Sequence, residues 1–246
     1  MPDRVAVVVG AGGDIGGACA RRLARTHGAV LCVDRDPARV APAGWARTLT
    51  ADAADPAFAD TVVAAAAGIG PVGAVVHAVA FEEHAPAVTV TRASVERSLA
   101  VGPLAALSLF RGLVAAEALA AGASLVAIGS LHATVPFPDC VGYNAAHGAL
   151  AQIVRTLAHE WAPRRIRVNA VVPGWIRTAG EAGLYGDGHL DRVAALLPLG
   201  RFGTAEDVAA AVGYVCSDEA GYVSGSFLTV DGGLGASLAR LPGGAA

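Results

Sequence analysis

The sequence predicts an α/β fold around a parallel sheet, and three observations support this prediction. Short apolar runs alternate with Ala-rich amphipathic segments along the 246 residues, with a regularity that disordered chains lack. The first run, Arg4–Gly10 (RVAVVVG), is rich in β-branched residues, as expected for a strand buried on both faces. A Gly-rich turn follows, and then Ile15, Cys19 and Leu23 at helical spacing. Strand, turn and helix in this order form the context that a dinucleotide-binding loop requires.

Composition narrows the classes of protein. A chain of this length suffices for one large α/β domain or two small ones. The net charge of −3 and the pI near 6.1 argue against a nucleic-acid surface. Apolar runs such as Ala78–Phe81 are far shorter than the roughly 20 residues of a membrane span, and we see no export signal. We therefore expect a cytoplasmic protein without nucleic-acid or membrane partners.

The sequence gives little support for a metal site. Neither a C-x-x-C pair nor zinc-type spacing links the four cysteines, which are Cys19, Cys32, Cys140 and Cys216. Reduced cysteines are the expectation. Glu82, Glu83 and His84 form a short polar run, but no further cluster of His, Asp or Glu lies nearby in the sequence. We therefore predict no metal.

The Gly-rich turn suits a pyrophosphate. Gly10 allows the tight turn, Gly12 lets backbone approach the phosphates, and Gly16 permits close packing of helix on strand. The N–H groups and the positive dipole end of the following helix would face the phosphates. Asp14 can begin that helix as its N-cap. Such a capping bond would turn its charge away from the pyrophosphate.

The second apolar run, Ala29–Val33, ends at an acidic residue, Asp34. An acid about 20 residues after the glycine turn can bind the adenosine ribose hydroxyls, and it repels a 2′-phosphate. Asp34 therefore favours NAD(H) over NADP(H). Arg35 is the opposing signal, because arginine can accommodate that phosphate. We give Asp34 more weight, because an acid at the end of the strand discriminates more strongly against a 2′-phosphate than a neighbouring arginine favours it.

A Ser, a Tyr and a His within Ile128–Leu150 have spacings that suggest a mechanism. Ser130 ends an apolar run, Tyr143 follows thirteen positions later, and His147 follows four after that. On a helix, Tyr143 and His147 would share one face. The stretch resembles the Ser…Tyr-x-x-x-Lys signature of the short-chain dehydrogenase/reductase (SDR) family, with His147 in the lysine's place. All 18 basic residues of the chain are Arg.

Further motifs of this family occur in the family's order between Arg4 and Gly233. The segments that resemble them are Pro173–Thr178 (P-G-x-I/V-x-T), Leu199–Gly203 with Val208–Asp218 (R-x-G…V-A…S-D) and Val230–Gly233 (the end of the seventh strand). The resemblance implies one domain over residues 1–246. It would be a doubly wound Rossmann fold, with seven parallel strands and helices on both faces.

The resemblance also implies the site residues. Tyr143 would be the general acid/base, Ser130 would bind the same substrate oxygen, and His147 would replace the lysine. The implied cofactor contacts are Gly10, Gly12, Asp14, Ile15, Gly16, Asp34, Asp52, Ala53, Ala78, Val79, Ala80, Tyr143, His147, Pro173, Gly174, Ile176 and Thr178. Substrate contacts would come from Leu131, His132, Phe137, Cys140, Trp175, Leu184 and Tyr185. These side chains favour a small, largely apolar molecule.

Two segments carry expectations about shape and assembly. The glycine-punctuated stretch over residues 179–198 is expected to be irregular and to form a substrate lid. Ser94–Leu119 and Tyr143–Trp161 are each expected to be one long helix. They correspond to the helices that pair subunits in the family, so we expect a homodimer or homotetramer.

Three departures from the family pattern concern one region. His147 replaces Lys, Leu99 replaces the Asn that helps to connect that Lys to solvent, and residues 77–80 (HAVA) replace Asn-Asn-Ala-Gly. A Tyr needs a nearby cation to act as a base near neutral pH, and an ordinary His is only about one-tenth protonated at a pH of roughly 7.5. His147 can still bind a ribose hydroxyl or carry a proton. We interpret His77 as a hydrogen-bonded core residue.

Three functions remain open. The first is an NAD-dependent oxidoreductase that interconverts an alcohol and a ketone through Ser130, Tyr143 and His147. The second is non-redox acid–base chemistry, such as dehydration, isomerisation or cyclisation, to which His132 would also contribute. The third is a non-catalytic subunit that binds dinucleotide. Formation of NADH together with an oxidised product would support the first function. Turnover of substrate without a change in the cofactor would support the second, and NAD binding without turnover would support the third.

Overall fold

Seven parallel strands form one sheet in the computed structural model, which describes residues 3–179 and 187–237. The strand order is β3-β2-β1-β4-β5-β6-β7, so the sheet is doubly wound and its order reverses between β1 and β4. The predicted fold class is therefore confirmed. The strands are β1 (Val5–Val9), β2 (Ala29–Asp34), β3 (Ala46–Thr50), β4 (Val72–His77), β5 (Leu119–Ile128), β6 (Arg167–Pro173) and β7 (Phe227–Val230).

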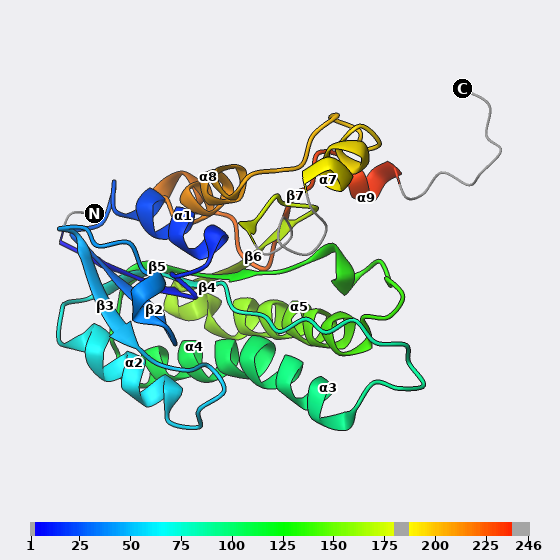
Figure 1. Cartoon of the computed structure of the whole chain (residues 1–246). Helices are drawn as coiled ribbons and strands as arrows, with labels where there is room; N and C mark the ends of the chain where they lie inside the picture. Colours follow the sequence, from blue (N-terminus) through cyan, green and yellow to red (C-terminus); the bar gives the residue numbers. More distant parts are fainter. Residues whose placement is uncertain (1–2, 180–186, 238–246) are drawn as a thin grey trace.

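Helices cover both faces of the sheet (Figure 1). One face carries α1 (Asp14–Leu23) and α8 (Ala205–Val215), and the other carries α2 (Phe58–Ala67), α4 (Ala105–Ala115) and α5 (Val141–Trp161). Helix α3 (Arg92–Leu99) packs against α5. Two short helices, α7 (Asp187–Ala194) and α9 (Leu234–Ser237), lie near β7.

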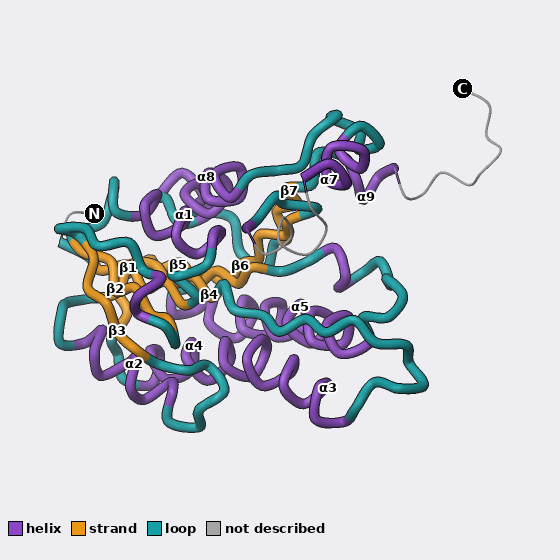
Figure 2. Tube along the Cα trace, viewed as in Figure 1, coloured by secondary structure: helices purple, strands orange, loops and turns teal. Residues whose placement is uncertain are grey.

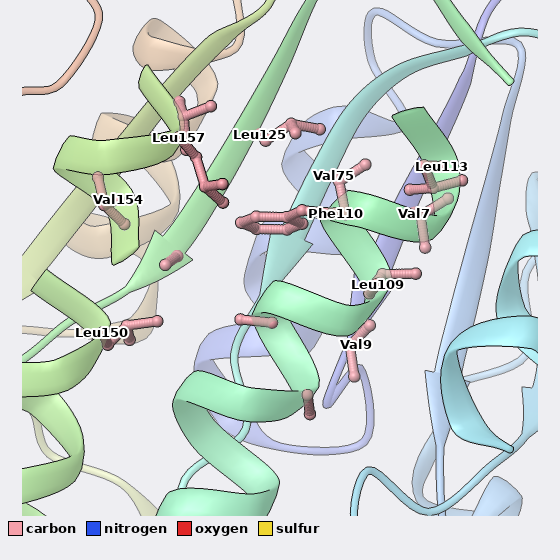
Figure 3. Packing of buried hydrophobic residues seen from close by; sticks show 14 of the residues in the cluster. Val7, Val9, Val75, Leu109, Phe110, Leu113, Leu125, Leu150, Val154 and Leu157 are labelled. Atoms are coloured by element: carbon pink, nitrogen blue, oxygen red, sulfur yellow. The ribbon is translucent and has the colours of Figure 1, made fainter. Parts of the chain in front are cut away.

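Strand β1 explains why both faces need a cover. All five of its residues are buried, and side chains alternate between the faces of a strand. Val5, Val7 and Val9 join the cluster under α2, α4 and α5, whereas Ala6 and Val8 join the cluster under α1 and α8. Figure 3 shows the first cluster, in which the ring of Phe110 from α4 lies among side chains of α5 and the strands.

The expected helix over Ser94–Leu119 is interrupted. Helix α3 is followed by a π-helical turn at Ala100–Leu104, then by α4, and Leu119 already belongs to β5. Pro103 lies inside the π turn; it has no amide hydrogen, and its ring clashes with the preceding turn of a regular α-helix. The helical run Arg92–Ala115 is long and apolar enough to cross a membrane, but 56% of its apolar window is buried in the fold. This is the situation of a core helix.

The expected lid lies only partly within the described residues. Residues 180–186, which include the predicted substrate contacts Leu184 and Tyr185, are outside them. Residues 187–194 form helix α7. The expectation of irregular structure is therefore wrong for this part of the segment. Leu190 and Val193, three apart, give the segment an apolar side, and Leu190 is buried. The glycines that suggested irregular structure do not extend past Gly188 in this segment.

Long connections follow β4 and β5, and Figure 2 shows them as loops. The N–H of Ala85 donates to the carbonyl oxygen of Asp139 at 2.8 Å and so joins the two. Ligands of open parallel sheets bind beyond the carboxyl ends of the strands. These two loops therefore border the region where a site is expected.

Candidate active site

The glycine-rich turn after β1 leaves no room for side chains where the sequence predicted close approach. Gly10 has a φ of +82°, a conformation that favours glycine. A Cβ at Gly16 would collide with the carbonyl oxygen of Gly10, and a Cβ at Gly12 would lie 2.8 Å from Asp34 Oδ2. The turn is thus closely packed against α1 on one side and β2 on the other.

Asp14 is not the N-cap of α1, contrary to the expectation. Gly13 takes that position with an extended backbone, and Asp14 is the first helical residue. The Asp14 carboxylate accepts a hydrogen bond from the N–H of Ala179 at 2.8 Å. The segment after β6 is thereby tied to the glycine turn. An acid in the first turn also favours the helix, because it faces the positive end of the helix dipole.

A cavity of about 310 Å³ opens at the carboxyl ends of β1, β2 and β4. Asp34 lies on its wall, and its carboxylate accepts the N–H of Gly12 at 2.8 Å and the N–H of Asp36 at 3.0 Å. Seven of the predicted cofactor contacts line this cavity: Gly10, Asp34, Asp52, Ala53, Ala78, Val79 and Ala80. We call it the adenosine cavity.

Three arginines also line the adenosine cavity: Arg35, Arg39 and Arg97. The guanidinium of Arg97 lies over the ring of Phe81, 4.4 Å from its centroid. Arg39 and Arg97 were not predicted, because neither belongs to a motif. Only the fold brings the turn after β2 and helix α3 to the same cavity.

The adenosine cavity fits half of a dinucleotide. Its small apolar side chains, such as Ala53 and Val79, would contact a flat base, and the Asp34 carboxylate would accept hydrogen bonds from ribose hydroxyls. A Cβ at Gly10 would collide with the backbone of Ala78, and one at Gly12 with Asp34 and Arg39, so only glycine lets the turn lie this close to the wall of the cavity.

The remaining predicted cofactor contacts are distributed around this cavity. Gly12 and Asp14 line a neighbouring hollow, and Pro173 and Gly174 line a further cavity described below. Ile15 and Ile176 pack against the core under α1 and α8, and Thr178 is half-buried after β6.

A further cavity of about 520 Å³ contains both Ser130 and Tyr143 in its wall, and we call it the substrate cavity. The predicted substrate contacts that line it are Leu131, His132, Phe137, Cys140 and Trp175. Other lining residues were not predicted as substrate contacts: Glu82, His84, Pro138, Asp139, Leu190, Val193 and Phe202. The fold therefore brings together the two residues that the sequence predicted to act on one oxygen atom.

Strand β5 and helix α5 position these two side chains. Ser130 follows β5 and caps the short helical turn Leu131–Ala133, where its Oγ accepts the N–H of His132 at 3.3 Å. This bond uses an oxygen lone pair and leaves the hydroxyl hydrogen for another acceptor. Tyr143 lies in the first turn of α5.

His132 is held beside Tyr143. Its ring stacks on Phe137 with centroids 4.3 Å apart, and it meets the ring of Tyr143 edge-on at 4.8 Å. His132 Nδ1 bonds Asn144 Oδ1 at 2.6 Å, and Asn144 Nδ2 donates to the carbonyl oxygen of Phe137 at 2.9 Å. Burial lowers the pKa of His132, which favours the neutral ring. With Nδ1–H donating to Asn144, Nε2 is the acceptor.

His147 is buried, with 5% of its surface exposed. Its Nδ1 has no hydrogen-bond partner, and its ring borders a void of only about 10 Å³ beside Gly102 and Pro103. It is absent from the described residues that line the adenosine and substrate cavities. Burial, followed by the nearby His132 and His77, lowers the pKa of His147 to about 4. The expected partial charge is therefore missing near neutral pH.

His77 is a hydrogen-bonded core residue, as interpreted from the sequence. It is 1% exposed at the end of β4, and its Nε2 bonds the carbonyl oxygen of Val101 at 3.0 Å. Burial lowers the pKa of His77 to about 4. The acceptor, Val101, belongs to the π-helical turn, so this hydrogen bond links the sheet to that turn. Leu99, which replaces the family's Asn, directly precedes the turn.

One group of residues on the wall of the substrate cavity was not expected. Glu82 and His84 follow β4, and the fold brings Cys140 to them from the loop before α5. Sequence spacing did not connect them, because His84 and Cys140 lie 56 positions apart. The only advance signal was the polar run at residues 82–84.

Comparisons with known proteins agree with this architecture. The chain matches the model of a family described as enoyl-(acyl carrier protein) reductase over residues 10–235. It is similar to a cis-4-hydroxycyclohexanecarboxylate dehydrogenase from Sinomonas cyclohexanicum, at 34% identity over 246 residues, which cover 94% of this chain and 96% of the relative.

Two solved structures show the same likeness over whole chains. A putative short-chain alcohol dehydrogenase from Sinorhizobium meliloti 1021 has a TM-score of 0.88 at 31% identity, with 98% of each chain covered. A putative NAD(P)-dependent gluconate 5-dehydrogenase from Beutenbergia cavernae, with bound NADP at low occupancy, has a TM-score of 0.83 at 34% identity, covering 95% of this chain and 97% of that one. The sheet order, the glycine turn and these matches agree: the chain is an oxidoreductase of the short-chain dehydrogenase/reductase family.

Proposed function

We propose that the protein is an NAD(H)-dependent oxidoreductase that interconverts an alcohol and a ketone. One observation carries the proposal: Ser130 and Tyr143 line a single cavity at the carboxyl ends of the strands, beside the adenosine cavity. A bound nicotinamide would supply the hydride acceptor or donor. The protein's own residues then have to hold the substrate oxygen and move one proton.

Ser130 and Tyr143 divide this work. The Ser130 hydroxyl has its lone pair engaged by the N–H of His132, so its hydrogen is available to the substrate oxygen. Tyr143 takes the hydroxyl proton when the alcohol is oxidised and returns it to the carbonyl oxygen when the ketone is reduced. His132, packed against the Tyr143 ring, restricts where the phenol can lie.

His147 contributes to this site through packing. Its ring contacts that of Tyr143, with centroids 4.3 Å apart, and its burial argues against a lysine-like charge. We propose that His147 positions the Tyr143 ring, and that the proton leaves by another route. Its unpartnered Nδ1 is the atom that a ribose hydroxyl would satisfy if the cofactor reached it.

The cofactor preference rests on Asp34. Its carboxylate already accepts two backbone N–H groups, which hold the charge at the wall of the adenosine cavity. A 2′-phosphate would meet that charge. Arg35 and Arg39 on the same wall are the opposing features, and the solved relative from Beutenbergia cavernae holds NADP. We propose that Asp34 decides in favour of NAD(H).

The substrate is proposed to be a small alcohol or ketone with an apolar body. A volume of about 520 Å³ suits a small molecule. Trp175 and Phe202 stack with centroids 6.2 Å apart and offer a flat apolar wall. The related dehydrogenase from Sinomonas cyclohexanicum is named for a hydroxylated six-membered ring, which is compatible with this shape.

A screen of alcohols and ketones with NAD(H), followed by the absorbance of NADH, tests the proposal. We expect faster hydride transfer with cyclic alcohols than with linear ones. Turnover of a substrate while the cofactor absorbance stays constant would contradict it. So would tight NAD binding with no turnover of any compound, which would indicate a non-catalytic subunit.

Non-redox acid–base chemistry is the second candidate, and His132 is the observation that favours it. This ring is held neutral beside Tyr143 on the cavity wall, so the pair can remove and return protons without hydride transfer. Incubation of the enzyme with a hydroxy ketone in deuterated water separates the two functions. Deuterium incorporation without oxidation would support the second candidate.

Assembly and location complete the proposal. The exposed side chains of Leu104 and Val141, at the starts of α4 and α5, suit an apolar interface. These helices correspond to the segments that pair subunits in the family, so we propose a homodimer or homotetramer in the cytoplasm.

A further inference from the structure

Three potential metal ligands meet on the wall of the substrate cavity: Glu82, His84 and Cys140. Cys140 Sγ lies 3.6 Å from His84 Nδ1 and 3.9 Å from Glu82 Oε1, and His84 Nε2 lies 3.0 Å from Glu82 Oε1. One ligand atom from each residue lies within 4.8 Å of the other two. No step assigned to Ser130 or Tyr143 uses this cluster.

The separations suit a tetrahedral metal ion. Zinc binds cysteine sulfur at about 2.3 Å and histidine nitrogen at about 2.0–2.1 Å, which places two such ligands roughly 3.5 Å apart in a tetrahedron. The observed distance between Cys140 Sγ and His84 Nδ1 is 3.6 Å. This pair can hold an ion with little movement, whereas the Glu82 carboxylate, which lies 3.0 Å from Nε2 of the same ring, has to turn toward the Nδ1 side to join it. Thiolate, imidazole and carboxylate together form a donor set that zinc accepts.

The backbone holds the two loops in this arrangement. The hydrogen bond from the N–H of Ala85 to the carbonyl oxygen of Asp139 joins the residues that follow His84 and precede Cys140. Asp139 has a φ of +61°, a left-handed conformation that is uncommon outside glycine and persists where its surroundings hold it. The turn at Asp139 leads directly into Cys140, whose side chain is buried. The ligands come from two loops that are fastened together.

Exposure and charge allow an ion to enter. Cys140 is 2% exposed, but the side chains of His84 and Glu82 are 56% and 40% exposed. Glu83 and Asp139, both acidic and exposed, flank the ligands, so the local charge favours a cation.

We propose that Glu82, His84 and Cys140 bind a divalent transition-metal ion of the Zn²⁺ class in the wall of the substrate cavity. With three protein ligands, a tetrahedral ion keeps one open position. In a cavity that also contains Ser130 and Tyr143, that position takes water or an oxygen or carboxylate of the substrate. The site stands on its own ligands and does not depend on the proposed redox function.

Metal titration of the full chain tests this inference. After treatment with a chelator, the protein is titrated with Zn²⁺ against a chromophoric chelator, and separately with Co²⁺ followed by optical absorption. We expect one equivalent of either ion, and a thiolate-to-cobalt charge-transfer band. Cys140→Ser should remove the band, and Cys140→Ser, His84→Gln and Glu82→Gln should each weaken Zn²⁺ binding by at least about tenfold. Even outer-sphere partners are worth 10- to 100-fold in affinity.

Glu83→Gln is the matched control, since it removes a neighbouring charge on the same loop but no ligand, and it should retain the band. A cobalt complex without the thiolate band, or zinc binding that survives both Cys140→Ser and His84→Gln, would overturn the site. His84 is exposed, so its variant remains informative if Cys140→Ser impairs folding, which thermal unfolding would reveal.

Discussion

The rings of Tyr143 and His147 lie in contact, with centroids 4.3 Å apart and planes tilted by 58°. His147 is buried and its pKa is lowered to about 4, so this contact joins a phenol to a neutral imidazole at ordinary pH. The family's lysine would have supplied a full positive charge at the same sequence position. Under the proposed function, Tyr143 would therefore act without a cation from position 147.

Tyr143→Phe should reduce turnover by at least about 100-fold, because positioned acid–base groups typically contribute 10²- to 10⁴-fold. The ring would keep its contacts with His132 and His147, so NAD(H) affinity should change little. Steady-state kinetics and a cofactor titration measure the two effects. A variant that retains more than about a hundredth of the wild-type rate would remove Tyr143 from the mechanism.

A neutral His147 predicts an unusual dependence of the oxidation rate on pH. A tyrosine without a neighbouring cation is a base only at high pH, since its unperturbed pKa is about 10. The rate of alcohol oxidation should therefore rise toward alkaline pH. His147→Lys should move this rise to lower pH by about one unit or more, provided that the ammonium reaches the cofactor side of Tyr143.

Leu99→Asn combined with His147→Lys is the proper comparison, because it also restores the family's path to solvent. His147→Ala tests whether the imidazole matters at all. A large loss of rate is expected if the ring positions Tyr143, whereas an unchanged rate would show that position 147 has no part in catalysis.

Cofactor selection should depend on the charge of Asp34. NAD(H) is expected to bind more tightly than NADP(H) by about 1–3 kcal/mol, or roughly 5- to 150-fold, because a 2′-phosphate would face that carboxylate. Asp34→Asn should reduce the difference between the affinities for NAD(H) and NADP(H). Asp36→Asn, on the same turn but outside the lining of the adenosine cavity, is the matched control. Equal affinities for the two cofactors in the wild type would contradict this proposal and would indicate that Arg35 offsets the charge of Asp34.

The sequence was a good guide wherever local chemistry decides the structure. The β-branched run of β1 predicted a strand buried on both faces, and the glycines at positions 10 and 16 predicted a turn with no space for a Cβ. Ser130 and Tyr143 were predicted to share a site because the family spacing is retained, and both line the substrate cavity.

Features that depend on packing between distant segments were not predictable in the same way. His147 lies beside the π-helical turn that contains Pro103, and that turn also interrupts the helix expected over Ser94–Leu119. Cys140 meets His84 only because the loops after β4 and β5 are joined by a backbone hydrogen bond. Asp14 was expected to cap α1, but its carboxylate accepts a hydrogen bond from the distant backbone N–H of Ala179.

Stability should fall as the pH is lowered from about 6.5 to about 4, because His77 and His147 are buried with pKa values lowered to about 4. Below pH 6.5 these two histidines bind protons in the unfolded chain, whereas in the folded chain they stay neutral down to about pH 4. Each histidine therefore favours unfolding by about 1.4 kcal/mol per pH unit across this window. His77→Gln keeps an N–H donor at the reach of Nε2 for the carbonyl of Val101 and should reduce the slope of unfolding free energy against pH by about that amount. Denaturant titrations at several pH values measure the slope, with His159→Asn, an exposed histidine of α5, as the control expected to keep it. An identical slope in His77→Gln and the wild type would show that His77 is protonated without unfolding.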